Sequence, residues 1–286
     1  MSGVVLITGA SSGIGLETCV YLAGKGLRVV GTMRNPAKSG ELQAAASKAG
    51  VQVDVAQLDV TSTESIESAV KTIAERYGKI DGLVNNAGIS IRGFFEDLSQ
   101  EEIKKVFETN VFGTMAVTRA VLPHMRAARQ GRIVLMTSVA GLIGAPAMGA
   151  YCSSKFALEG FGETLALEAG LFGIHVSLIE PGNINTQIWQ SNSVVAGRAN
   201  DPRSPYKAYF AESEKMAEWA VRTTPIKASH VAKAIYDALT SKSPKLRYLI
   251  GYRPGVVLAL RRIIPSGIFD RLYTNSVVGK ISRAGS

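Results

Sequence analysis

A tyrosine and a lysine four positions apart are the residues in this sequence that most directly indicate chemistry. Tyr151 and Lys155 lie on one face at the start of a predicted helix, because residues at i and i+4 are neighbours on a helix surface. A free tyrosine, with a pKa of about 10, is a poor acid or base at neutral pH, but a nearby ammonium favours the phenolate and lowers that pKa. Ser138 follows a predicted strand and can hold a substrate oxygen beside Tyr151. The three residues predict proton exchange with an alcohol or a carbonyl oxygen.

A glycine-rich turn near the start of the chain indicates a phosphate-binding site. Its glycines lie between a buried-type strand and a helix, where they permit tight turning and close approach of a pyrophosphate to the backbone. Exposed N–H groups at the start of the helix would then bind the negative charge. The sequence therefore predicts a dinucleotide-binding turn made of Thr8, Gly9, Ser11, Ser12, Gly13, Ile14 and Gly15.

The end of the second predicted strand indicates which dinucleotide binds. NAD-binding sites place a carboxylate there, but residues 31–35 contain none. Arg34 would instead pair with the 2′-phosphate of NADP(H), which a carboxylate would repel. The hydroxyls of Ser11 and Ser12 could add donors to that phosphate. NADP(H) is therefore the predicted cofactor; the alternative for Arg34 is an ordinary solvated arginine.

The third predicted strand ends at Asp59 and Val60, which we also assign to the cofactor site. The carboxylate of Asp59 is placed to accept a hydrogen bond from the adenine amino group. Asp59 could alternatively cap the helix that follows, a role that Thr61 or Thr63 could supply as well.

Short β-branched runs that alternate with longer helical patterns predict how these residues are brought together. The alternation favours an α/β fold with a Rossmann-type, doubly wound parallel sheet of about seven strands, with ligands at the carboxyl ends of the strands. We expect a long helical stretch over 101–129 with a kink or break at Pro123. The predicted strands are 4–8, 27–33, 51–58, one ending at 83–85, 132–137, 174–180 and 246–250.

Residues 183–225 depart from this alternation and are expected to form a substrate-binding loop or lid. At the 7% aromatic content of the whole chain, the segment 189–219 should hold about two aromatic residues. It holds five, which are Trp189, Tyr206, Tyr209, Phe210 and Trp219.

The tail, residues 254–286, combines apolar and basic residues. One acidic residue, Asp270, stands against five basic ones, so the tail could lie on a lipid surface or cover a lipophilic pocket. The alternative, which we prefer, is a tail packed on its own domain or on a neighbouring subunit. The basic residues are Arg261, Arg262, Arg271, Lys280 and Arg283.

Composition and charge indicate the number of domains, the partners and the cellular compartment to expect. The 286 residues are 46% hydrophobic and fit one catalytic domain, 1–286. The net charge of +9 comes without a long Lys/Arg run, so we expect no nucleic-acid partner. No apolar stretch reaches the ~18 residues of a membrane span, and no signal peptide precedes the first strand. Two cysteines and three separated histidines predict no metal site and suit a reducing compartment, which we take to be the cytoplasm.

Together these motifs resemble the short-chain dehydrogenase/reductase family over about residues 4–250. For the reaction, the resemblance implies that Ser138 positions the substrate oxygen, that Tyr151 is the acid/base, and that Lys155 binds the nicotinamide ribose and tunes Tyr151. It also implies that Asn110 holds a water relaying protons from Lys155 to solvent. From the residues alone, Asn110 is only a polar residue that interrupts a helical stretch.

For the cofactor, the resemblance adds two motifs: Asn85-Asn86-Ala87-Gly88, and Pro181-Gly182 leading to Thr186. Asn86 and Gly88 would shape the adenosine ribose site, and Thr186 would contact the carboxamide. Tyr151 and Lys155 would touch the cofactor as well as the substrate. Family members are commonly homodimers or homotetramers, so we expect a homo-oligomer.

A narrower likeness concerns the substrate. Residues 151–160 and 175–180 look like the branch that contains estrogenic 17β-hydroxysteroid dehydrogenase and photoreceptor retinol dehydrogenase, which reduces bulky lipophilic carbonyls with NADPH. The expected substrate is therefore a lipophilic secondary or retinol-like alcohol and its ketone or aldehyde. A 3-oxoacyl or sphingoid-type ketone is the rival substrate, and a non-catalytic NADP(H)-binding sensor is the rival function.

Overall fold

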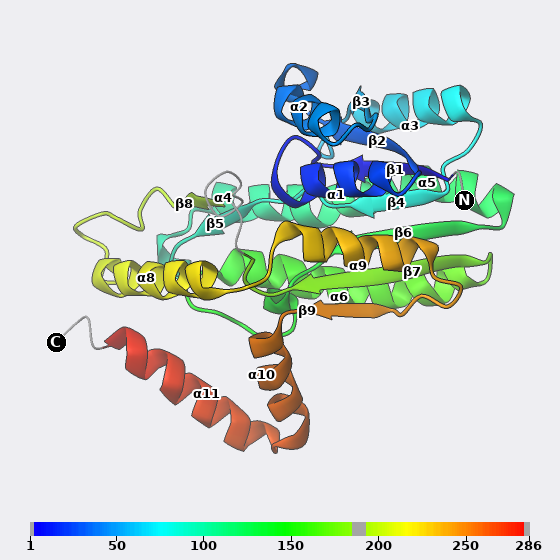
Figure 1. The fold of residues 1–286 in the computed structure, drawn as a ribbon. Coiled ribbons are helices and arrows are strands. Elements are labelled where there is room, and N and C mark those ends of the chain that lie inside the picture. Colours follow the sequence, from blue (N-terminus) through cyan, green and yellow to red (C-terminus); the bar gives the residue numbers. More distant parts are fainter. Residues whose placement is uncertain (1–2, 185–192, 283–286) are drawn as a thin grey trace.

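The protein is described here from a computed structural model that places residues 3–184 and 193–282 (Figure 1). In this part of the chain, seven parallel strands form one sheet in the order β3-β2-β1-β4-β6-β7-β9. The order reverses between β1 and β4, which is the switch point where ligands bind in doubly wound sheets. The strands are β1 (Val4–Thr8), β2 (Arg28–Met33), β3 (Asp54–Gln57), β4 (Gly82–Asn85), β6 (Gly131–Met136), β7 (Ile174–Pro181) and β9 (Arg247–Ile250).

Helices cover both faces of this sheet (Figure 1). The central strands β1 and β4 are buried along their whole length and are mainly apolar, as expected when both faces of a sheet are covered. One apolar core lies between the sheet and α3 (Thr63–Tyr77), α5 (Gly113–Ala128) and α6 (Gly149–Gly170). The other lies between the sheet and α1 (Gly13–Gly24), α2 (Gly40–Lys48) and α9 (Ala228–Thr240). The predicted Rossmann-type sheet is therefore confirmed.

The stretch 101–129 does not break at Pro123. Pro123 lies inside α5, where the fully buried side chains of Val121 and Met125 on either side of it anchor the helix to the core. The irregularity lies earlier, between α4 (Gln100–Phe107) and α5, where Glu108–Phe112 forms one π-helical turn, η3. Such turns are rare and often lie at functional sites. Asn110 is the central residue of this one.

Residues 183–225, expected to be a loop, contain regular structure. The short strand β8 (Ser193–Val195) pairs in parallel with β5 (Ser90–Arg92), and α8 (Lys207–Thr223) follows. Apolar residues at 210, 217 and 220 recur at helical spacing, and no Gly or Pro interrupts 207–223, so a helix is favoured there.

The tail forms two helices, α10 (Tyr252–Ile263) and α11 (Ser266–Ile281). Figure 1 shows α11 (red) running back below α8 (yellow), so that the last helix returns towards the carboxyl edge of the sheet. Phe269 and Ile281 of α11 are buried against the rest of the chain. No helix in the described ranges is long and apolar enough to cross a membrane.

Candidate functional site

The glycine turn between β1 and α1 is fixed by hydrogen bonds to the neighbouring strand. The Thr8 hydroxyl accepts hydrogen bonds from the backbone N–H groups of Asn86 and Ala87, each at 3.0 Å. The Asn86 amide donates in return to the carbonyls of Thr8 and Gly9, at 2.9 and 3.0 Å. Thr8 and Asn86 therefore shape the turn, and the structure places the predicted Asn85-Asn86-Ala87-Gly88 motif directly against it.

Only glycine fits at two positions of this turn. Gly9 has a φ of +69°, and a Cβ there would lie 2.8 Å from the Cα of Ala87. A Cβ on Gly15 would lie 2.2 Å from the Gly9 carbonyl oxygen. The side chain of Ser12 does not cap α1, and no acidic residue stands in the first turn of that helix. The first N–H groups of α1 thus remain available to an anion, so the turn fits a dinucleotide pyrophosphate.

Ser138, Tyr151 and Lys155 meet at the carboxyl ends of β6 and β7. Ser138 follows β6, and its hydroxyl donates to the Pro181 carbonyl at 3.2 Å. Tyr151 lies in the first turn of α6, and a side-chain hydrogen bond joins it to Ser138. The Lys155 ammonium donates to the Met136 carbonyl at 2.7 Å and lies 5.6 Å from the centroid of the Tyr151 ring. The predicted trio is therefore assembled in one place.

Burial shifts the pKa values of two residues of this trio, Tyr151 and Lys155. Burial raises the pKa of Tyr151 to about 12, although the hydrogen bond with Ser138 acts in the opposite direction. Burial also lowers the pKa of Lys155 to about 8, and the negative charge of Glu159 opposes that change. The expected lowering of the pKa of Tyr151 is therefore not found. The lysine ammonium bonds to the Met136 backbone carbonyl, and the loss of solvation on burial is the largest influence on the pKa of Tyr151.

Asn110 is fully buried next to the trio. Its amide nitrogen donates to the Ile89 carbonyl at 2.9 Å and to the Ser154 hydroxyl at 3.0 Å, and its Oδ1 accepts the Ile89 N–H at 2.8 Å. A Cβ built on Gly88 would lie 3.3 Å from this Oδ1 and 3.8 Å from the Lys155 nitrogen. The π-turn thus brings Asn110 to within a few ångströms of Lys155, which sequence spacing alone does not reveal.

The remaining predicted cofactor residues lie along the same edge of the sheet. Arg34 is exposed directly after β2. Asp59 accepts hydrogen bonds from the N–H and the hydroxyl of Thr61, at 3.0 and 2.8 Å. The cap of α3 is Ser62, so neither Thr61 nor Thr63 serves in that role. Val60 is buried, and Thr186 lies outside the described residues.

A cavity of about 490 Å³ opens where these segments converge. Ten of the predicted residues line it, and Lys155 is the single charged residue among the described lining residues. The other predicted residues stand behind the lining or further along the sheet edge. The ten lining residues are Ser12, Ile14, Gly15, Asn86, Gly88, Ser138, Tyr151, Lys155, Pro181 and Gly182.

The far half of the cavity is apolar and was not identified from the sequence. The connection between β6 and α6 supplies Ile143 and Met148, and α8 supplies Met216. Tyr273 and Val277 of α11 line it as well, and the Tyr273 hydroxyl donates to the Gly144 carbonyl at 2.8 Å. The spacing of 269, 273 and 277 along one helix face was the signal that could have found the α11 residues.

The aromatic residues singled out in 183–225 do not form this lining. Tyr206 stacks on Phe94 with 4.8 Å between ring centroids, and Phe210 is buried in a separate core cluster. The exposed Trp219 and the half-buried Tyr209 also lie outside the lining, and Trp189 is outside the described residues.

A second hollow of about 500 Å³ lies between α3 and α5, lined by side chains such as Lys71, Arg119 and His124. None of the predicted site residues contributes to it, so the cavity at the sheet edge is the better candidate. Within the described ranges, no group of three or more His, Cys, Asp or Glu side chains is arranged to hold a metal ion.

Curated proteins with related sequences include dehydrogenases and reductases. The chain is 40% identical over 273 residues to retinol dehydrogenase 8 of Bos taurus, covering 92% of this chain and 86% of that protein. It is 36% identical to human 17-beta-hydroxysteroid dehydrogenase type 1, covering 92% and 82%. It is also 36% identical to 3-ketodihydrosphingosine reductase of Bacteroides thetaiotaomicron, covering 87% of each protein.

Solved structures share the fold. A short-chain dehydrogenase from Streptomyces avermitilis superposes with a TM-score of 0.79 at 31% identity, with full coverage of both chains. A xylitol dehydrogenase bound to NAD+ has a TM-score of 0.76 at 27% identity, covering 87% of this chain and 98% of that one. ElxO with NADP bound has a TM-score of 0.73 at 28% identity, covering 87% of this chain and 96% of that one. The family model described as short chain dehydrogenase matches residues 3–194. The chain therefore belongs to the short-chain dehydrogenase family of oxidoreductases.

Proposed function

We propose that this protein is an NADP(H)-dependent oxidoreductase that interconverts a lipophilic secondary or retinol-like alcohol and its ketone or aldehyde. One observation carries the proposal. A single cavity joins the glycine turn to the Ser138, Tyr151 and Lys155 trio, and continues into an apolar chamber. A dinucleotide at one end and an apolar carbonyl at the other would meet at Tyr151.

In the proposed reaction, Ser138 and Tyr151 hold the substrate oxygen between their hydroxyls. With a pKa of about 12, Tyr151 is protonated at neutral pH and is ready to donate its proton to a carbonyl oxygen. Lys155 binds the nicotinamide ribose and contributes positive charge beside the tyrosine. Asn110 supports the proton path from Lys155 to solvent. When bound, the nicotinamide cofactor supplies or accepts the hydride.

NADP(H) is the proposed form of the cofactor. The exposed Arg34 after β2 favours a 2′-phosphate, and residues 31–35 contain no carboxylate that would bind the ribose hydroxyls. Structures similar to this chain have been solved with NADP and with NAD+, so the fold alone does not decide the preference.

The apolar half of the cavity supports a lipophilic substrate. Ile143, Met148, Met216 and Val277 offer no charge for a polar ligand to pair with. The relatives named retinol dehydrogenase 8 and 17-beta-hydroxysteroid dehydrogenase type 1 fit this chemistry. A sphingoid-type or 3-oxoacyl ketone is the second candidate, because a relative is named 3-ketodihydrosphingosine reductase. A non-catalytic NADP(H) sensor remains the alternative to an enzyme.

The first test is turnover of NADPH with a panel of apolar ketones and aldehydes that includes a 3-keto sphingoid base. We expect wild-type activity, and a loss of about 100-fold or more in kcat for Tyr151→Phe, since the general acid is removed while the ring stays in place. Equal rates for wild type and variant, or tight NADPH binding without turnover of any compound, would reject the enzyme in favour of the sensor.

Three further properties complete the proposal. The chain acts as one catalytic domain, 1–286, in which 183–225 and 254–286 help to enclose the substrate. It forms a homodimer or homotetramer, which the exposed side chains of Phe112, Leu167 and Leu171 support. It resides in the cytoplasm, where its two free, buried cysteines would stay reduced.

A further inference from the structure

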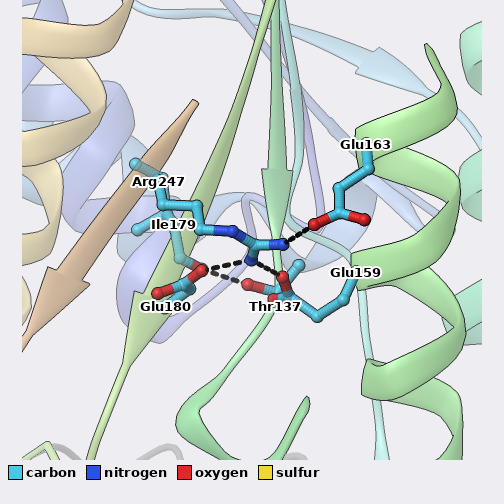
Figure 2. A network of polar contacts seen from close by, with 6 residues as sticks. All are labelled: Thr137, Glu159, Glu163, Ile179, Glu180 and Arg247. Atoms are coloured by element: carbon cyan, nitrogen blue, oxygen red, sulfur yellow. Dashed lines mark hydrogen bonds and ion pairs between the residues drawn. The ribbon is translucent and has the colours of Figure 1, made fainter. Parts of the chain in front are cut away.

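A charged network includes Glu159 of α6, which stands four positions after Lys155. Arg247, the first residue of β9, contacts three carboxylates from two other elements (Figure 2). One of its terminal nitrogens donates to Glu159 of α6 and to Glu180 of β7, the latter at 2.6 Å, and the other donates to Glu163 of α6 at 2.6 Å. Three carboxylates thus surround one guanidinium, and negative charge is in excess there.

Two of these carboxylates are buried, which requires an explanation. Glu159 and Glu180 are 6% and 2% exposed, whereas the Glu163 side chain is 59% exposed. An ionised carboxylate loses most of its solvation inside a protein, so a buried one is retained only with compensating partners. Arg247 supplies that compensation. One oxygen of Glu159, Oε1, is left buried without a geometrically suitable hydrogen-bond partner.

Glu159 stands one helical turn beyond Lys155, on the face of α6 that already carries Tyr151 and Lys155. Gly141 of η4 (Val139–Gly141) packs against both positions. A Cβ there would lie 2.9 Å from the Lys155 carbonyl oxygen and 3.1 Å from the Glu159 side chain. The Lys155 ammonium donates to the Met136 carbonyl, and the Glu159 side chain lies against the next residue, Thr137 (Figure 2), so both charged groups reach the end of β6.

We propose that Glu159, clamped by Arg247, is a positioning residue that keeps Lys155 charged inside the buried site. This inference rests on the proposed function of Tyr151 and Lys155. Burial lowers the pKa of Lys155 to about 8, and the charge of Glu159 is what opposes the loss of the proton. The other titratable groups facing this region are Tyr151, Glu163, Glu180 and Arg247. Glu108 of the adjoining π-turn is exposed to solvent.

Glu159→Gln tests the proposal, because it removes the charge and keeps the shape. Without the carboxylate the pKa of Lys155 should fall further, so the ammonium is lost at lower pH. The basic limb of kcat/KM for carbonyl reduction should then move down by about one pH unit, the effect typical of one nearby opposite charge. Glu163→Gln is the matched control, since it removes another carboxylate from the same Arg247. The basic limb of kcat/KM in this variant should stay at the wild-type pH.

Glu159→Asp should restore the wild-type limb, because it keeps the charge. Where Glu159→Gln does not fold, Glu159→Met offers an uncharged side chain of similar length. The inference is overturned if the pH profile of kcat/KM is unchanged in the uncharged Glu159 variant, or if it shifts equally in Glu163→Gln. In both cases the wild type would still turn over its substrate. Failure of the proposed function is recognised separately, by the absence of turnover in the wild type or by full activity in Tyr151→Phe.

Discussion

Arg34 is the side chain on which the proposed preference for NADP(H) depends. It lies exposed at the carboxyl end of β2, where the 2′-phosphate would arrive. A hydrogen bond to a charged group contributes about 1.5–3 kcal/mol, so Arg34→Ala should raise the KM for NADPH about 10- to 100-fold and leave that for NADH almost unchanged.

Arg28→Ala is the control for this measurement, because Arg28 begins the same strand at the opposite edge of the sheet. Initial rates with both reduced cofactors give the comparison. If Arg34→Ala weakens NADPH and NADH equally, Arg34 is an ordinary surface arginine and the cofactor preference must be explained by other residues.

The individual site residues differ in how far the sequence could predict them. Tyr151 and Lys155 were found because helical spacing is a local property, and Ser138 because it follows a strand. The raised pKa of Tyr151 was not predicted, since the burial that causes it comes from the folded chain and not from local spacing. Glu159 received no role for the same reason, because its partner Arg247 is 88 positions away.

At the scale of elements, the connection from β1 into α1 offers the sharpest test of the cofactor site. A methyl group on Gly15 would lie 2.2 Å from the Gly9 carbonyl oxygen of the turn and 2.5 Å from the Asn86 amide nitrogen that bonds to the turn. Gly15→Ala should therefore displace the turn and weaken NADPH binding at least tenfold, as measured by quenching of protein fluorescence or by calorimetry.

Gly160→Ala is the matched control for this substitution. Gly160 is an exposed glycine within α6, and nothing lies within 4 Å of an added Cβ. It should bind NADPH normally and gain up to about 1 kcal/mol of stability from the better helix propensity of alanine. Normal binding by Gly15→Ala would show that the turn does not contact the cofactor.

The elements also show where sequence patterns stop being sufficient. Alternating strands and helices predicted the sheet, because a parallel sheet buried on both faces leaves an unmistakable apolar pattern. The break in 101–129 was assigned to Pro123 because proline removes a helical hydrogen bond, yet core packing on both sides of Pro123 holds α5 together. The π-turn at Asn110 has no comparable local signal, because its amide is fixed by Ile89 and Ser154 from other segments.

At the scale of the whole molecule, the two tail helices have two different surfaces. One surface of α11 faces the cavity through Tyr273 and Val277, as expected for a tail that packs on its own domain and covers a pocket. The side chains of Ile263, Ile268 and Leu272 are 79%, 56% and 59% exposed, although they are apolar. Large apolar side chains that are exposed together usually mark a contact surface.

We propose that this outer surface touches anionic lipid weakly, because exposed Arg262 and Arg271 accompany its apolar side chains. The full chain should sediment with vesicles of phosphatidylserine and phosphatidylcholine, and less as salt increases. Each basic residue near such a surface contributes about 1 kcal/mol, so joint Arg262→Glu and Arg271→Glu substitution should reduce partitioning tenfold or more.

The control is Lys48→Glu with Lys71→Glu, which makes the same change of net charge on α2 and α3, away from the tail (Figure 1). This pair should reduce partitioning to vesicles far less. If both pairs of substitutions reduce partitioning equally, only the net charge of the protein matters. If the wild type does not sediment with vesicles, the proposal of lipid contact is wrong, and a second copy of the chain becomes the expected partner of the outer surface of α10 and α11.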